Sequence, residues 1–192
     1  MDFFLIGIIS YLMGSIPFGY ILTKIFLKKD IREIGSGNIG ATNALRTGNK
    51  GIGYSTLILD ILKAVVPVVY VKIFYQDFLY LASLSAFLGH VFPIWLKFKG
   101  GKGVATYIGI VTSINFLFGL VTCVIWLLSA AILRISSFSA LLSTISGPFI
   151  VFFLLDSSFL GMSAMLSCLI FWTHKANIRR ILNGTESNIN VN

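Results

Sequence analysis

The sequence predicts an all-α integral membrane protein, a seven-transmembrane-helix bundle with some short helices that forms one polytopic domain over residues 1–192. The first reason is composition: 56% of the residues are hydrophobic and 11% are charged, whereas a water-soluble domain has about 25% charged residues. The second is a mean hydropathy of +0.90. The third is a series of apolar runs close to the ~20 residues that a helix needs to cross a bilayer.

The predicted membrane helices are 3–27, 52–75, 78–96, 104–114, 116–133, 139–155 and 158–173. The first is expected to be retained, because no basic region precedes it and its apolar run is too long for a cleaved signal peptide. Residues 104–133 are apolar over 30 positions, too long for one crossing and short for two. Asn115, with Gly109 and Gly119 nearby, predicts a turn that divides them into a re-entrant pair. A single crossing there would give six helices.

The basic residues predict that the N-terminus lies outside the cell and the C-terminus in the cytoplasm. In this orientation thirteen of the 15 lysines and arginines lie in cytoplasmic segments, while Lys63 lies within a span and Lys72 near the outer face. This is the positive-inside pattern, and it holds only if 104–133 crosses twice, which favours seven helices. The net charge of +8 then reflects orientation and attraction to anionic lipid. No nucleic acid is expected as a partner.

The first cytoplasmic loop, residues 35–46, is small, polar and rich in glycine, and it ends in Arg46. Glycines let the backbone approach a ligand closely, and an arginine fork matches phosphate oxygens. Gly35-x-Gly37-x-x-Gly40 matches the dinucleotide fingerprint, but it follows a membrane helix instead of a strand, so that interpretation is rejected. The loop is expected to hold a small anion beside the bilayer. A flexible interhelical turn is the alternative, and it gives Arg46 no role.

A second loop, Gly100-Gly101-Lys102-Gly103, comes directly before a predicted helix. Backbone N–H groups at a helix start, together with a lysine, favour phosphate binding, although the spacing excludes a Walker A loop. A helix-breaking turn whose lysine reaches to the membrane surface is the alternative. His90 lies at membrane depth near Pro93, where a lone histidine is more often a packing partner than a catalyst.

The last two polar segments are 134–139 and 174–186. The serines of the first, Ser137 among them, could cap the next helix or donate to a ligand. In the second, His174 and Asn177 share one face of a helix. Attraction to anionic lipid explains the basic residues around them, but it does not explain the histidine and asparagine.

Four further side chains lie inside the predicted spans. Asp60 and Lys63 are three residues apart on one helix face, within ion-pair reach, and should point into the bundle. A structural role and a direct ligand role are equally open for this pair. Cys123 and Cys168 lie in apolar runs and are expected to be reduced thiols. No spacing of cysteine or histidine suits a metal ion, so neither a metal nor a cofactor is expected.

Three motifs follow one another along the chain: Ser36–Asn43 with Arg46; Gly89-His90 with Phe98 and Gly100–Thr106; and His174–Arg180 with Gly184 and Glu186. They resemble the motifs of the bacterial acyl-phosphate:glycerol-3-phosphate acyltransferases, the PlsY family. Asp60-Ile61-Leu62-Lys63 and Arg134 with Ser136-Ser137 are also similar to that family, so the likeness runs from about Leu12 to Glu186. Lys175 stands where the family often has arginine, so no bidentate role is expected there.

The resemblance implies a seven-helix enzyme of the bacterial inner membrane with its active site on the cytoplasmic side. It would transfer a fatty acyl group from acyl phosphate to the 1-hydroxyl of glycerol 3-phosphate. The products would be lysophosphatidic acid and inorganic phosphate, in the first step of phospholipid synthesis, with neither acyl-CoA nor acyl-carrier protein as donor. Its partners would be acyl phosphate, glycerol 3-phosphate and membrane lipid, and it would act as a monomer.

No histidine–aspartate pair that orients a general base is visible, so positioning and electrostatics are expected to act on an already activated donor. Either His174 or a phosphate oxygen of the substrate could accept the hydroxyl proton. The predicted catalytic residues are Ser36, His174 and Asn177. The predicted substrate-binding residues are Asn38, Thr42, Asn43, Arg46, Gly100, Gly101, Lys102, Ser137 and Arg179, and the predicted structural residues are Asp60, Lys63 and Glu186.

A small-anion transporter is the alternative function, because glycine-rich breaks at membrane depth also occur in transporters. A transporter needs polar groups on both sides of the bilayer, and the predicted outer face is nearly bare. A purely structural membrane subunit is a third option, and it leaves the three polar motifs unexplained.

Overall fold

The computed structural model describes residues 1–189, and all regular secondary structure in that part of the chain is helical. The all-α prediction is therefore confirmed. The residues cluster into two compact units, Met1–Ile114 and the part of the chain that begins at Asn115.

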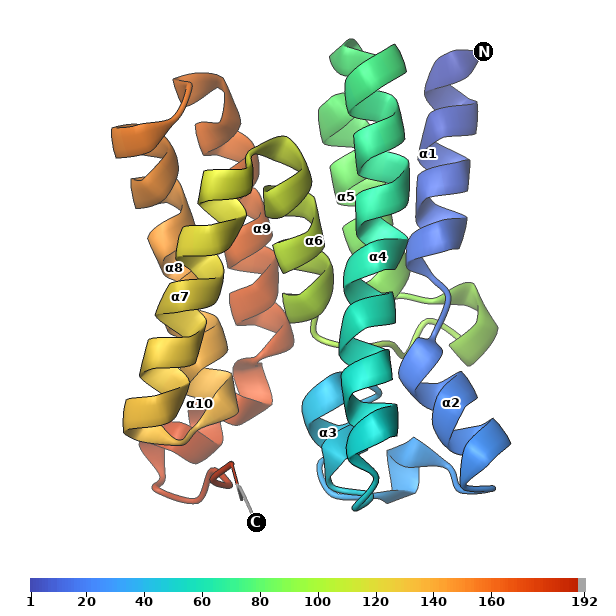
Figure 1. Cartoon of the computed structure of the whole chain (residues 1–192), viewed down its shortest axis with the longest axis vertical. Coiled ribbons are helices and arrows are strands. Elements are labelled where there is room, and N and C mark those ends of the chain that lie inside the picture. The colour runs from blue at the N-terminus through green and yellow to red at the C-terminus, as the bar shows by residue number, and fades with distance from the viewer. Residues whose placement is uncertain (190–192) are drawn as a thin grey trace. The chain divides into compact units, whose positions relative to one another are not determined.

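The first unit is a group of antiparallel helices with shorter elements at one end (Figure 1). Its helices are α1 (Asp2–Gly14), α2 (Phe18–Phe26), α3 (Ala41–Leu45), α4 (Lys50–Phe74), α5 (Leu79–Val91) and α6 (Val104–Ile114). Helix α1 packs on α5 and α4, and α6 packs on α4. Short 3-10 turns lie at Ile31–Glu33, Gln76–Phe78 and Ile94–Leu96.

The first predicted membrane helix is wrong in one respect, because the chain breaks between α1 and α2. Pro17 has no N–H to donate and disfavours a helical conformation at the residue before it. Helix α1 consequently ends at Gly14, and α2 starts at Phe18. The break leaves the Ile16 carbonyl outside a regular helix, where it accepts the Phe18 N–H over 3.1 Å and has a second lone pair for another donor.

Small residues bring α1 and α5 into close contact. A Cβ atom on Gly14 would overlap the Ala86 carbonyl oxygen, and one on Gly89 would overlap the Tyr11 carbonyl oxygen. The Tyr11 hydroxyl also donates to the Phe92 carbonyl oxygen over 2.7 Å. Close backbone approach of this kind is how helices associate inside a bilayer.

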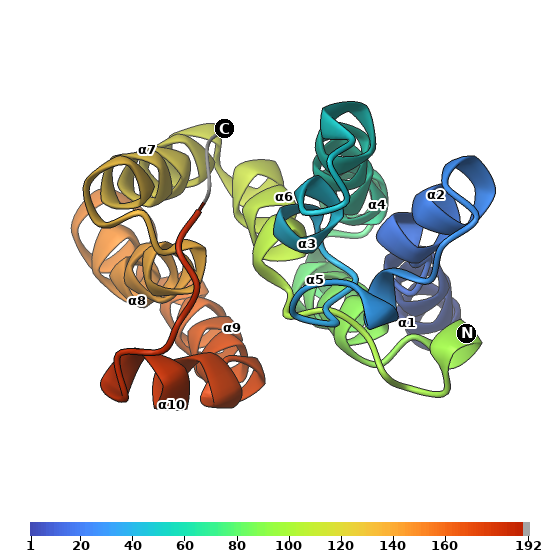
Figure 2. The same cartoon turned by 90° about the horizontal axis from the view of Figure 1, so that it is seen from below.

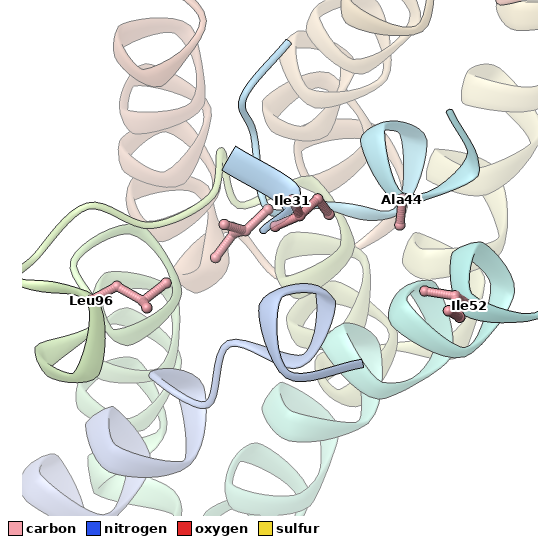
Figure 3. Close-up of a cluster of buried hydrophobic side chains, with 5 residues drawn as sticks. Ile31, Ala44, Ile52 and Leu96 are labelled. Carbon is pink, nitrogen blue, oxygen red and sulfur yellow. The ribbon is translucent and has the colours of Figure 1, made fainter. Parts of the chain in front are cut away.

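An apolar cluster lies beneath the loop that joins α2 to α4. Its buried members are Ile31, Ile39, Ala44, Ile52 and Leu96, and Figure 3 shows four of them converging from the loop, from the start of α4 and from the turn after α5. The cluster therefore holds the chain before and within the first polar loop against the segment that precedes the second.

The second unit contains α7 (Phe116–Leu133), α8 (Ser136–Leu154), α9 (Leu160–Thr173) and α10 (Lys175–Leu182). Helices α7, α8 and α9 pack in chain order, and α10 follows α9 with a change of direction (Figure 2). The turn predicted at Asn115 is confirmed: its side-chain oxygen accepts a hydrogen bond from the Phe118 N–H over 3.2 Å and caps α7.

Between residues 1 and 189, four helical stretches are long and apolar enough to cross a membrane: Asp2–Phe26, Gln76–Leu96, Phe116–Leu133 and Ser136–Leu154. Val104–Ile114 and Ser157–Thr173 are apolar but shorter. Helix α4 has 25 residues and carries Asp60 and Lys63 near its middle. The seven-helix count and the orientation of the termini stay predictions.

Candidate functional site

The loop at 35–46 is organised by one buried side chain, that of Asn43. Its amide nitrogen donates to the carbonyl oxygens of Ile31, Ile34 and Asn38 over 3.1, 2.9 and 2.8 Å. Its amide oxygen accepts from the Ser36 N–H over 3.0 Å. Asn43 is only 2% exposed, so its polar atoms are committed to the loop backbone and hold it in one conformation.

Two glycines let this loop turn tightly. Gly35 and Gly37 have φ angles of +54° and +71°, a region that residues with a Cβ atom rarely adopt. A Cβ atom on Gly35 would also lie 2.5 Å from the Asn43 amide oxygen and 2.8 Å from Arg46 Cδ. Ser36 and Arg46 are exposed on the outside of this fold, and Asn38 and Thr42 are half-buried.

The glycine-rich loop at 100–103 packs directly on the end of α5. The Gly100 N–H donates to the Val91 carbonyl oxygen over 3.0 Å, and the Gly101 N–H donates to the His90 carbonyl oxygen over 3.1 Å. These two N–H groups are therefore hydrogen-bonded within the protein, and substrate binding by Gly100 and Gly101 stays a prediction. Lys102 lies just before the first turn of α6, where N–H groups have no partner within the helix.

His90 explains why residue 101 is a glycine. A Cβ atom on Gly101 would overlap the His90 ring at Nε2, and His90 is 3% exposed. The histidine is thus a buried support beneath the loop. The sequence predicts a packing role for His90 but does not identify Gly101 as its partner, because only the fold brings residues 90 and 101 together.

The ion pair predicted between Asp60 and Lys63 is present. Lys63 Nζ lies 2.8 Å from Asp60 Oδ1 and also donates to the Ile16 carbonyl oxygen over 2.8 Å. Lys63 therefore satisfies the carbonyl at the break between α1 and α2. The presence of Pro17 was the signal in the sequence for that break.

In the second unit, Glu186 joins three other polar residues. Its Oε1 accepts from Ser137 Oγ over 2.8 Å and from Asn177 Nδ2 over 2.6 Å, and its Oε2 accepts from Arg180 Nε over 2.6 Å. Burial acts to raise the pKa of Glu186, but these three hydrogen bonds outweigh it and lower that pKa below its usual value. Ser137 therefore binds Glu186, and helix α8 has no side-chain cap.

Glu186 also fixes which way the Asn177 amide points. A carboxylate accepts hydrogen bonds, so the NH2 group of Asn177 must face it. Asn177 is 3% exposed, and its Oδ1 accepts no hydrogen bond from any residue between 1 and 189. The geometry therefore presents a buried acceptor oxygen suited to a substrate hydroxyl group.

The proton position on His174 is set in a similar way. Its Nδ1 lies 2.8 Å from the Ile170 carbonyl oxygen, and a carbonyl can only accept. Nδ1 therefore carries the proton, and in the neutral ring the lone pair lies on Nε2. His174 is 2% exposed and stands at the junction of α9 and α10.

The polar residues thus form one group in each unit. Asn43, Ser36 and Arg46 share the loop at 35–46, which the apolar cluster joins to the segment before Lys102. His174, Asn177, Ser137 and Glu186 gather around α10. Arg180 bonds Glu186, whereas Arg179 is exposed. No group of three His, Cys, Asp or Glu residues suited to a metal ion occurs between residues 1 and 189.

An all-helical fold with membrane-length helices and polar, glycine-rich loops defines an integral membrane protein equipped for an anionic substrate. The pattern of the family described as glycerol-3-phosphate acyltransferase matches residues 4–184. The chain belongs to this family, and it is therefore an integral membrane acyltransferase of phospholipid synthesis.

Similar proteins agree with this assignment. The glycerol-3-phosphate acyltransferase of Pelagibacter ubique (strain HTCC1062) is 58% identical over the full length of both chains. That of Rhodopseudomonas palustris (strain HaA2) is 49% identical over 95% of this chain and 93% of its own.

The crystal structure of PlsY (YgiH), an integral membrane glycerol 3-phosphate acyltransferase, in its glycerol 3-phosphate form has a TM-score of 0.92 and 35% identity. The comparison covers 99% of this chain and 96% of that one. Its lysophosphatidic acid form has a TM-score of 0.88, covering 98% and 95%.

Proposed function

We propose that this chain transfers a fatty acyl group from acyl phosphate to the 1-hydroxyl of glycerol 3-phosphate. The products are lysophosphatidic acid and inorganic phosphate, and the reaction opens phospholipid synthesis at the cytoplasmic side of the bacterial inner membrane. The observation that carries the proposal is the similarity, over almost the whole chain, to a protein solved in glycerol 3-phosphate and lysophosphatidic acid forms.

The reaction is balanced without a cofactor. The 1-hydroxyl oxygen attacks the acyl carbonyl carbon, and a C–O ester bond forms while the C–O bond of the mixed anhydride breaks. The phosphate leaves with the electron pair of that bond. The hydroxyl proton goes either to a phosphate oxygen or to Nε2 of His174.

Cations and oriented polar groups supply the catalysis in this proposal. Arg46 and Lys102 hold the substrate phosphates, and Arg179 is a further anion ligand in this proposal. Ser36, Asn38 and Thr42 bind the donor phosphate or the attacking hydroxyl. Asn43, Gly100 and Gly101, whose polar groups serve the backbone, hold the loops in position.

The second unit would align the acceptor. Asn177 Oδ1 accepts from a hydroxyl of glycerol 3-phosphate, and Glu186 keeps the amide in that orientation. Ser137 is held by Glu186 beside the same residues. Positioning of this kind lowers the barrier by replacing a bimolecular encounter with an oriented one.

The experiment that tests the function uses the purified protein as a monomer in detergent with glycerol 3-phosphate and one donor at a time. Acyl phosphate should release inorganic phosphate and form lysophosphatidic acid in equal amounts, and acyl-CoA should not react. Absence of phosphate release, or equal use of acyl-CoA, would contradict the proposal.

His174→Ala separates the two proton acceptors. If His174 is the base, turnover should disappear while glycerol 3-phosphate binding, measured by calorimetry, remains. If the substrate phosphate is the acceptor, the variant should keep measurable turnover.

A further inference from the structure

We propose that the buried group Asp60, Lys63 and His90 positions both polar loops of the first unit, at 35–46 and at 100–103, and so controls substrate binding without touching the substrate. The inference rests on the proposed function for its kinetic consequence. Its structural consequence, the ordering of the two loops, does not depend on that function.

Lys63 is the link to the first loop. By binding the Ile16 carbonyl it fixes the point at which α2 starts. One turn into α2, a Cβ atom on Gly19 would overlap the Ile39 carbonyl oxygen and lie 3.0 Å from Thr56 Cγ2 on α4. Displacement of the start of α2 therefore moves the backbone of the first loop at Ile39.

Asp60 and His90 are the link to the second loop. Asp60 Oδ1 lies 3.9 Å from His90 Nδ1, a separation too long for a hydrogen bond, and both side chains are almost fully buried. The Nε2 end of the same ring lies against Gly101, where a Cβ atom would overlap it, and the His90 carbonyl accepts the Gly101 N–H. The ring on which the second loop rests therefore lies between the Asp60 carboxylate and Gly101.

The side chains around Asp60 and Lys63 restrict where these two residues can move. Asp60 and Lys63 are 2% and 4% exposed, and the Phe18 ring centroid lies 6.0 Å from Lys63 Nζ. Thr106 Oγ1 donates to the Asp60 carbonyl oxygen over 3.4 Å. The apolar cluster also joins the first loop, through Ile39, to Leu96 in the segment that precedes the second loop. The two loops are thus held by one polar and one apolar support.

A positioning role can be separated from a stabilising one. Replacing a buried ion pair with uncharged groups of similar volume is often neutral for stability, whereas removing one partner is strongly destabilising. The test variant is therefore the double substitution Asp60→Asn with Lys63→Met. The matched control is Lys72→Met, because Lys72 is a lysine on the same helix and its side chain also donates to backbone carbonyl oxygens. Its partners are Ser113 and Ile114, over 3.0 and 2.8 Å, and neither residue belongs to the two loops.

Three properties should be measured on the detergent-purified proteins: hydrogen–deuterium exchange of peptides covering 35–46 and 99–104 without substrate, the thermal unfolding midpoint, and KM and kcat for glycerol 3-phosphate. The double variant should exchange faster in both peptides and raise KM by roughly threefold to thirtyfold, the range of coupling along such networks. Its midpoint should stay near that of the Lys72→Met control, which should show neither loop effect. Unchanged exchange in both loops, or equal effects in the control, would overturn the proposal.

His90→Ala keeps the proposal testable if the double variant does not fold. It removes the support beneath Gly101 but leaves Lys63 on Ile16, so exchange should rise in 99–104 and stay unchanged in 35–46. A rise in both loops, or in neither, would contradict the assigned connections.

If the unaltered protein releases no phosphate from acyl phosphate, the proposed function fails, whereas the exchange pattern still decides the positioning role.

Discussion

At the scale of residues, the polar side chains divide into those that hold the loops and those that extend from them. The polar side-chain atoms of Asn43 and Glu186 form hydrogen bonds with neighbouring groups of the protein. Ser36 and Arg46 are exposed beside the residues that hold the loop. The sequence motifs contain both kinds of residue, because position along the chain does not show which side chains are buried and which are exposed.

Arg46→Ala and Lys102→Ala should each weaken substrate binding by about 1.5–3 kcal/mol, the usual value of a hydrogen bond to a charged group. The corresponding rise in KM is roughly tenfold to 150-fold. Lys50→Ala, which removes an exposed cation at the start of α4, serves as the control and should leave KM unchanged. Normal kinetics in both test variants would show that neither Arg46 nor Lys102 binds a substrate phosphate.

Glu186 should make the stability of the second unit depend on pH. Its pKa is lowered from the ordinary 4.5 in the folded protein, so its stabilising effect is complete above pH 4.5 and is lost as the pH falls below that value. Glu186→Gln has no carboxyl group to protonate. The unfolding midpoint of the variant should therefore lie below that of the parent at pH 7, and the difference should shrink below pH 4.5. A difference that does not change with pH would show that the carboxylate charge is not the cause.

At the scale of elements, the sequence located the helices well and the interruption of the first one poorly. Hydrophobic runs predicted helices close to those observed from α4 to α9, and Asn115 marked the turn between α6 and α7. The break after Gly14 was missed because an apolar run gives the length of a span but does not show where the backbone bends. The contact between His90 and Gly101 was also beyond prediction, since it depends on how α5 and the following loop fold back together.

Gly89→Ala tests the close contact between α1 and α5. The added methyl group would overlap the Tyr11 carbonyl oxygen, and overpacking of this kind costs about 1–3 kcal/mol. Gly161→Ala is the matched control, because a Cβ atom there meets nothing within 4 Å on α9. The unfolding midpoint should fall for Gly89→Ala and should stay equal or rise for Gly161→Ala. Equal midpoints for both variants would show that the two helices can separate without cost.

At the scale of the whole molecule, family membership and composition agree on a membrane acyltransferase. The concentration of basic residues in alternate connecting segments supports a cytoplasmic location for all three motifs. The proposed acyl phosphate donor is already activated, because phosphate is a good leaving group, so the proposed reaction does not need a histidine–aspartate base. We therefore propose that this chain joins the 1-hydroxyl oxygen of glycerol 3-phosphate to the acyl carbon of acyl phosphate.

Mass spectrometry of the lipid product tests that claim most directly. Glycerol 3-phosphate labelled with oxygen-18 in its 1-hydroxyl group should be incubated with acyl phosphate and the purified protein. We expect lysophosphatidic acid that carries the label in its ester oxygen, together with an equal amount of unlabelled inorganic phosphate. A product without the label, or release of phosphate without lipid formation, would contradict it.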